Sequence, residues 1–261
     1  MTADEILVAL AIKHEGNWDA IYADFKNRNM KELETYLKIA KKYNYQYITF
    51  FSDKYPDIIK QCCKPPFVLF YRGNIDLLQN VGKNVAVVGS RECTEYGAKM
   101  TDEIVRTVAK EYTIVSGMAR GIDAIAHNAA IEVGGKTIAV LGGGVDYCYP
   151  PSNKSLYKEI VRNHLVISEY PGKTMPQPEN FPFRNRIIAM ISRGTIVTEA
   201  YQHSGTLTTV MFTLDYSRLL LCVPYPATAD SECNRLISTG AYLIENGNDA
   251  LEVLKNDIHL G

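Results

Sequence analysis

Four short glycine-containing segments follow apolar runs in this sequence, and three of them also carry small polar or basic side chains. In chain order they are Gly89-Ser90-Arg91, Gly117 to Arg120, Gly142 to Gly144 and Ser204-Gly205-Thr206. Glycine lets a backbone approach a phosphate closely, and free N–H groups at the start of a helix attract anions. If the apolar runs are parallel strands, these segments meet at one edge of a sheet, and we predict an anion-binding rim there. Ordinary turn chemistry is the alternative for each segment taken alone.

A fifth segment, residues 178–193, interleaves aromatic rings with arginines. It contains Phe181, Phe183, Arg184, Asn185 and Arg186 just before an apolar stretch. Single-stranded nucleic acids need this mixture, because their bases stack on rings while arginines hold the phosphates. The alternative is a pair of core phenylalanines with arginines bound to acids, and composition alone leaves both open.

Two familiar nucleotide-binding motifs are absent from the sequence. The first glycine turn reads G-S-R-E-C-T-E-Y-G, whereas a dinucleotide site needs G-x-G-x-x-G. The P-loop pattern G-x-x-x-x-G-K-[ST] does not occur either. Arg91 in the first turn instead offers a bidentate guanidinium to a phosphate.

The residues that could support catalysis have structural explanations. Asp123 and Asp146 could form a carboxylate pair, but an aspartate after a glycine turn more often caps a helix or fixes the loop. We expect His127, in I-D-A-I-A-H-N-A-A, to be packed or solvent-facing rather than a base. Ser204 lacks the G-x-S-x-G turn of hydrolases. We therefore predict a protein that is not an enzyme and that has no catalytic residue and no cofactor.

Composition limits the class of protein further. The 261 residues are 46% hydrophobic and 22% charged, an ordinary globular mixture. A net charge of −1 disfavours a nucleic-acid binder that is basic over its whole surface, although a local basic patch is still allowed. The six cysteines form no C-x-x-C pair, so neither a disulfide framework nor a zinc site is indicated. No apolar stretch reaches the ~20 residues of a membrane helix, and the N-terminus is a poor signal peptide, so we expect a cytoplasmic protein with no membrane partner.

The elements that must position these residues follow from the apolar pattern. Short β-branched runs such as NVAVVGS, TIVSG, TIAVLGGG and GTIVTEA alternate with amphipathic helical segments. This alternation predicts an α/β fold, Rossmann-like, with a mostly parallel sheet. FVLFYRG, before the first of these runs, could add an edge strand. Residues 1–54 are rich in Lys, Glu and Tyr with helical spacing, and we predict a small helical N-terminal domain followed by the sheet domain at 55–261.

The chain resembles the DNA-processing protein A (DprA/Smf) family from about Tyr55 to about Leu254. The motifs that carry this resemblance are G-S-R at 89–91, S-G-M-A-R-G-I-D at 116–123, L-G-G-G-V-D-Y-C-Y-P-P-S-N at 141–153, S-E-Y-P at 168–171, F-P-F-R-N-R-I-I-A at 181–189 and T-E-A…S-G-T-L at 198–207. They are long and occur in order along the chain.

The resemblance implies an extended Rossmann fold that binds single-stranded DNA. Such proteins protect incoming DNA during natural transformation and load the RecA recombinase onto it, acting as homodimers without known catalysis. The family's DNA groove maps here onto Arg91, Phe181, Arg184 and Arg186. Together with the glycine segments, the predicted DNA-binding set is Gly89, Ser90, Arg91, Gly117, Arg120, Phe181, Arg184, Asn185, Arg186, Ser204, Gly205 and Thr206.

The resemblance also places a dimer contact near the end of the chain. Residues 236–254 carry more apolar side chains than one helix face needs for its own core. We expect Leu236, Ile237, Leu243 and Ile244 at the interface, and the alternative is that they are buried within one chain.

Departures from the family pattern leave alternatives open. A basic residue often precedes F-P-x-R-N-R, but here residues 175–179 read M-P-Q-P-E. The sequence ends shortly after A-L-E-V-L, so we expect no C-terminal winged helix. Nucleotide phosphoribohydrolases of similar fold use P-G-G-x-G-T-x-x-E, whereas this chain has S-G-T-L-T-T without the final glutamate, although Glu199 lies near the rim. Such an enzyme is the runner-up, and a sensor of free nucleotides is a third possibility.

Overall fold

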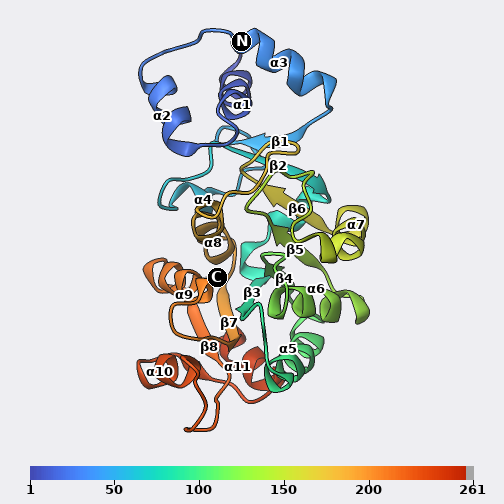
Figure 1. The fold of residues 1–261 in the computed structure, drawn as a ribbon, viewed down its shortest axis with the longest axis vertical. Coiled ribbons are helices and arrows are strands. Elements are labelled where there is room, and N and C mark those ends of the chain that lie inside the picture. Colours follow the sequence, from blue (N-terminus) through green and yellow to red (C-terminus); the bar gives the residue numbers. More distant parts are fainter. Residues whose placement is uncertain (257–261) are drawn as a thin grey trace.

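The computed structural model describes residues 1–256, in which one nine-stranded sheet runs through the molecule with helices on both of its faces (Figure 1). The strand order is β1-β2-β6-β5-β4-β3-β7-β8-β9. Seven strands are parallel to one another: β3 (Asn84–Gly89), β4 (Thr113–Ser116), β5 (Thr137–Val140), β6 (Leu165–Ser168), β7 (Gly194–Glu199), β8 (Leu219–Cys222) and β9 (Tyr242–Leu243). The predicted α/β class and mostly parallel sheet are confirmed. The last five residues of the predicted sheet domain, 257–261, lie outside the described residues.

Helices cover the sheet as two layers (Figure 1). One face packs on α8 (Asn180–Met190), α9 (Gly205–Asp215) and α10 (Cys233–Ser238). Toward the C-terminal strands the other face packs on α5 (Glu95–Val108), α6 (Ile122–Glu132) and α11 (Gly247–Asn256), and toward β6 it packs on α7 (Lys154–Asn163). Alternate residues of the strands point to opposite faces, so Val85 and Val87 join one cluster while Ala86 and Val88 join the other. Burial on both faces explains why the strands are almost continuously apolar.

The N-terminal helices share a core with the sheet. The chain begins with α1 (Ala3–Lys13), α2 (Trp18–Lys26) and α3 (Leu33–Lys42), and α1 starts with a capping box in which Thr2 and Glu5 bind each other's backbone. Leu7 and Leu10 of α1 lie in the same apolar cluster as Phe70 and Val166 of the sheet. The three helices therefore stabilise one end of the sheet as well as one another.

The segment before the predicted boundary at residue 54 ends in a strand of the sheet. After α3 the chain forms β1 (Gln46–Thr49), which pairs with β2 (Val68–Gly73) in antiparallel orientation, and β2 pairs with β6 in the same way. A short helix α4 (Asp57–Lys60) and two 3₁₀ turns, η1 (Ile75–Leu78) and η2 (Val81–Lys83), complete this region. Most of the predicted segment 67–73 forms strand β2, but this strand is not at the edge of the sheet, because β1 pairs with it on the outside. In residues 1–256, no helix has both the length and the apolar character needed to cross a membrane.

Candidate nucleic-acid interface

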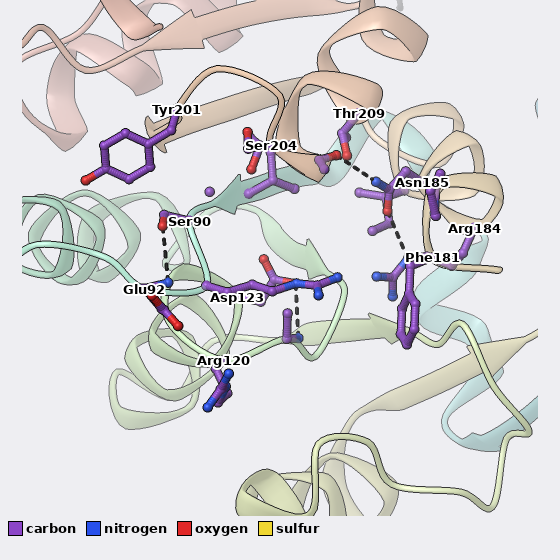
Figure 2. A pocket seen from close by; sticks show the side chains of 18 of the residues that line it. Ser90, Glu92, Arg120, Asp123, Phe181, Arg184, Asn185, Tyr201, Ser204 and Thr209 are labelled. Carbon is purple, nitrogen blue, oxygen red and sulfur yellow. Dashed lines mark hydrogen bonds between the residues drawn. The ribbon is translucent and has the colours of Figure 1, made fainter. Parts of the chain in front are cut away.

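A cavity of about 810 Å³ lies beside β3 and β7, at the point in the sheet where the strand order changes direction (Figure 2). The strands after β3 add on one side of it, and β7 and β8 add on the other, so the loops that follow β3 and β7 diverge. The carboxyl ends of parallel strands at such a reversal are the usual ligand site of open α/β sheets. Most of the predicted DNA-binding set lines this cavity: Gly89, Ser90, Arg91, Arg120, Phe181, Arg184, Asn185, Ser204, Gly205 and Thr206.

The first two glycine segments support each other. Ser90 is buried, and its Oγ accepts a hydrogen bond from the Glu92 N–H at 3.1 Å, which closes the turn after β3. Gly121 has a φ of +68°, and a Cβ there would lie 2.4 Å from the Ser90 carbonyl oxygen. Only glycine fits this close approach. Arg91 is left exposed beside the cavity.

Asp123 fixes the second segment from inside. Its Oδ2 accepts hydrogen bonds from the backbone N–H groups of Gly117 at 3.2 Å and Ala119 at 3.1 Å. Burial raises the pKa of the Asp123 carboxyl, and the nearby Arg184 guanidinium opposes that rise. The carboxyl thus holds the loop, as expected for an aspartate after a glycine turn, and Arg120 at the tip is exposed (Figure 2).

Phe181 stands in the first turn of α8 and is half-buried at the cavity wall (Figure 2). A Cβ on Gly142 would lie 2.9 Å from its Cδ1, so the ring rests directly on a bare backbone. The prediction for the third glycine segment is thereby corrected, because none of its glycines lines this cavity and Gly142 supports the ring instead. The Arg91 Cζ lies 5.4 Å from the ring centroid, a cation–π arrangement.

Arg184 is a buried cation beneath this wall. Only 4% of it is exposed, and its Nη1 donates to the carbonyls of Gly117, at 2.8 Å, and Val140. Burial lowers the pKa of Arg184 to about 10, which Asp123 partly opposes, so the guanidinium stays charged at neutral pH. Asn185 donates from Nδ2 to the Gly205 carbonyl at 3.2 Å and thereby links α8 to the start of α9. Gly117 packs against the Arg184 guanidinium and lines a smaller cavity next to the first.

Arg186 does not reach the cavity, and its predicted DNA contact is corrected. It is 1% exposed and forms a two-pronged ion pair with Glu169, both N···O distances being 2.6 Å. Its remaining donors bind the carbonyls of Cys63, Lys64 and Phe183, which occupies all five N–H groups of the guanidinium. The Arg186 Cζ also stacks 3.7 Å from the Phe183 ring centroid. Arg186 therefore joins α8 to residues 63–64 and to the end of β6.

The N-terminus of α9 opens into the cavity from the opposite side. Ser204 precedes the helix, and a Cβ on Gly205 would meet no atom within 4 Å. The buried side chain of Thr206 completes this wall. The first N–H groups of a helix and its macrodipole favour an anion at such a place.

The side chains considered for catalysis form hydrogen bonds or ion pairs with other groups of the protein. Glu199 is fully buried and accepts hydrogen bonds from Thr94 Oγ1 at 2.5 Å and from the Tyr225 hydroxyl at 3.0 Å. Asp146 pairs with both prongs of Arg72 at 2.8 Å. His127 is fully buried with Nδ1 2.6 Å from Thr137 Oγ1. Within residues 1–256, no three His, Cys, Asp or Glu side chains gather in a group that could hold a metal ion.

The predicted dimer residues differ in exposure. Ile244 is fully buried in the core under α5 and α11, so it is corrected from an interface residue to a core residue. Leu236 and Ile237 are half-buried against the core cluster under α10. Leu243 is 49% exposed on the edge strand β9, beside Tyr242 at 50%.

Two tyrosines in the cavity wall were missed by sequence reasoning. Tyr149 and Tyr201 both line the cavity. Tyr149 is 47% exposed, and its ring centroid lies 5.6 Å from that of Phe181. The sequence did hold a signal for Tyr149, because it lies in Y-C-Y-P-P shortly after the third glycine segment. An aromatic side chain on such a loop indicates a binding residue.

Comparisons with known proteins agree with this arrangement. A profile of the family described as DNA recombination-mediator protein A matches residues 46–255, which begin at β1. The chain is 44% identical to DNA processing protein DprA of Streptococcus pneumoniae over 203 residues, which are 77% of this chain and 71% of that protein. It is 36% identical to DprA of Bacillus subtilis over 207 residues, 78% of this chain and 69% of that one.

Two solved structures share the fold. DNA processing protein A from S. pneumoniae superposes with a TM-score of 0.82 at 37% identity, over 96% of this chain and 93% of its own. A structure that addresses the single-stranded DNA binding mode of DNA processing protein A from Helicobacter pylori gives a TM-score of 0.74 at 30% identity, over 82% of this chain and 98% of its own. The chain therefore belongs to the DNA recombination-mediator protein A family of DNA-processing proteins.

Proposed function

We propose that the protein binds single-stranded DNA in the cavity at the carboxyl ends of β3 and β7. The observation that carries the proposal is Phe181, a half-buried ring seated on the Gly142 backbone between the exposed Arg91 and the rest of the wall. A base stacks on such a ring whatever its sequence, and Arg91 and Arg120 supply charge for the phosphates. Because Arg91 is exposed, a base that stacks on Phe181 can displace its guanidinium from the ring.

We further propose that the protein protects incoming DNA in natural transformation and loads RecA onto it, in the cytoplasm. Membership of the family supports this role, and so does the single-stranded DNA binding mode of the H. pylori relative. A site that stacks bases would hold the DNA as a single strand, which is the form that this role requires.

We propose that the protein is not an enzyme. A nucleotide phosphoribohydrolase would need Glu199 at its substrate, but this carboxylate is fully buried and bonded to Thr94 and Tyr225. Incubation with nucleoside monophosphates should therefore release no free base. Release that is lost in Glu199→Gln would favour the enzyme over the DNA-binding protein.

We propose a homodimer that forms along the β9 edge of the sheet. An edge strand leaves backbone groups unpaired, and Tyr242 and Leu243 add two exposed apolar side chains there. Sedimentation at tens of micromolar should give the mass of a dimer, and Leu243→Lys should give that of a monomer. A wild-type monomer at that concentration would refute the dimer.

The DNA-binding proposal is tested by titration with oligo-dT and with blunt duplex at several salt concentrations. Bases in a duplex are already stacked and cannot reach Phe181, so the single strand should bind much more tightly. Single strands of different sequence should bind about equally. Equal affinity for duplex and single strand at the same salt would refute a site built on stacking.

A further inference from the structure

A second, smaller cavity adjoins the first on the far side of Phe181. Its volume is about 380 Å³, within the ~300–1,000 Å³ range of small-molecule sites. Six residues line both cavities: Arg91, Ala119, Arg120, Tyr149, Phe181 and Arg184. The second cavity is completed by Gly117 and by the segment 150–152. The two are thus neighbouring compartments of one cleft, with Phe181 and Tyr149 between them.

The lining of the second compartment favours a flat anionic ligand. It contains three arginines and, among the described residues, no carboxylate. Tyr149, Phe181, Pro150 and Pro151 add aromatic and proline surface, and three small residues, Gly117, Ala119 and Ser152, complete the lining. A nucleobase joined to a phosphate matches both features, because its ring stacks on apolar faces while its charge meets guanidinium groups.

Tyr149 is placed to stack on a second base. Its ring plane is tilted 41° from that of Phe181, so the two rings do not cover each other as a flat stack. With 47% of the side chain exposed, ring surface is available to a ligand. Two tilted rings at the border of two compartments suit two successive bases of a strand better than one.

The compartment is formed before any ligand arrives. Asn153, at the end of the 3₁₀ turn η3 (Pro151–Asn153), donates from Nδ2 to the carbonyls of Met118, at 3.0 Å, and Ala119, at 3.2 Å. This ties the wall that carries Tyr149 to the wall formed by the second glycine segment. The Tyr157 hydroxyl donates to the Val145 carbonyl at 2.7 Å and holds the same loop from below.

We infer that the second compartment is a base-binding subsite in which Tyr149 stacks on the nucleotide next to the one held by Phe181. This inference rests on the proposed function, because it requires a single strand in the cleft. It adds to that function a second position along the strand and a residue, Tyr149, that lies outside the predicted DNA-binding set.

The test compares Tyr149→Ala, Tyr149→Leu and Tyr149→Phe with the wild type in titrations with fluorescently labelled oligo-dT. Loss of one stacked base should weaken binding about 5- to 150-fold in the alanine and leucine variants. The phenylalanine variant should bind like the wild type, because the ring and not the hydroxyl makes the contact. Tyr43→Ala is the matched control, since Tyr43 is 58% exposed and pairs with Tyr45 at 6.0 Å away from both compartments. It should bind normally.

A base-free oligomer of deoxyribose phosphate separates stacking from a change in loop shape. Wild type and Tyr149→Ala should bind it equally, because it offers no base to either protein. If Tyr149→Ala loses the same affinity for the base-free oligomer as for oligo-dT, the inference is overturned. It is also overturned if Tyr149→Ala binds oligo-dT normally while Phe181→Ala binds it weakly, although the proposed function would then still stand. A wild-type protein that does not prefer single strands would refute the proposed function itself.

Discussion

Arg186→Met should destabilise the protein strongly without removing a phosphate contact. The change leaves the Glu169 carboxylate, 5% exposed, without its cation. Breaking a buried ion pair in this way costs ~3–5 kcal/mol, against the ~5–15 kcal/mol that a domain has in total. The carbonyls of Cys63 and Lys64 also lose their donors, but they lie near the surface, where water can replace a donor.

Urea unfolding measures this loss. With an m-value of about 3 kcal/mol per molar, the midpoint should fall by about 1–2 M. Removing both charges, in Arg186→Met with Glu169→Leu, should recover much of the loss, because no buried charge is then left unpaired. A double variant less stable than Arg186→Met would contradict the assigned ion pair.

Oligo-dT binding by the folded protein then distinguishes a structural arginine from a DNA contact. Arg186→Met should keep the wild-type salt dependence, whereas Arg120→Met, at the exposed loop tip, should keep the wild-type stability and lose up to ~0.7 in log–log slope. If Arg186→Met unfolds at the wild-type urea concentration but binds with a flatter slope, Arg186 contacts phosphate and its burial is misassigned.

Three further outcomes are expected. Arg91→Ala should weaken oligo-dT binding and reduce its log–log salt slope by up to ~0.7, while Phe181→Ala should cost ~1–3 kcal/mol with the slope nearly unchanged; equal slope changes would mean that Phe181 acts through the shape of the wall. Gly142→Ala adds a Cβ 2.9 Å from the Phe181 Cδ1. It should weaken oligo-dT binding when Phe181 is present but not in the Phe181→Ala background. An effect of equal size in both backgrounds would disprove that Gly142 supports the Phe181 ring. Burial lowers the pKa of His127 from 6.5 to about 3. As the pH drops below about 6.5, the imidazole is therefore protonated in the unfolded chain before it is protonated in the folded protein. The free energy of unfolding should then fall by up to ~1.4 kcal/mol per pH unit. His127→Asn should remove this component in denaturant titrations at pH 7 and pH 5, and identical pH dependence in both proteins would count against a neutral buried imidazole.

The fold was predictable where the pattern was long and regular. Residues 85–88 are apolar at every position, as is typical of a short strand that is covered on both faces. Strand β1 was not predictable, because Gln46–Thr49 is short and half polar, and it becomes a strand by pairing with β2. Its existence depends on a partner about twenty residues away and not on its own propensity.

The site was predictable as a location more than as a set of contacts. The glycine segments identified the sheet edge, since turn chemistry is local. Arg184 and Arg186 look alike in sequence, and what separates them is Glu169, seventeen residues away, which takes up Arg186 completely. Phe181 and Phe183 differ in the same way, because one faces the cavity and the other lies under the Arg186 guanidinium. Burial and partner choice are tertiary properties that spacing does not encode.

The anchoring of α8 by two buried arginines has a consequence for the entropy of binding. Arg184 joins the helix to the loop after β4 and to the end of β5, and Arg186 joins it to residues 63–64 and to Glu169. The turn that carries Phe181 is therefore immobilised on two sides. Immobilising a flexible side chain on association costs ~0.5–1.5 kcal/mol, and a platform that is already rigid avoids that cost. If the protein binds single-stranded DNA as proposed, the conformational entropy lost on binding comes from the DNA strand and from the exposed side chains of Arg91 and Arg120. Affinity is then set by how readily the strand unstacks.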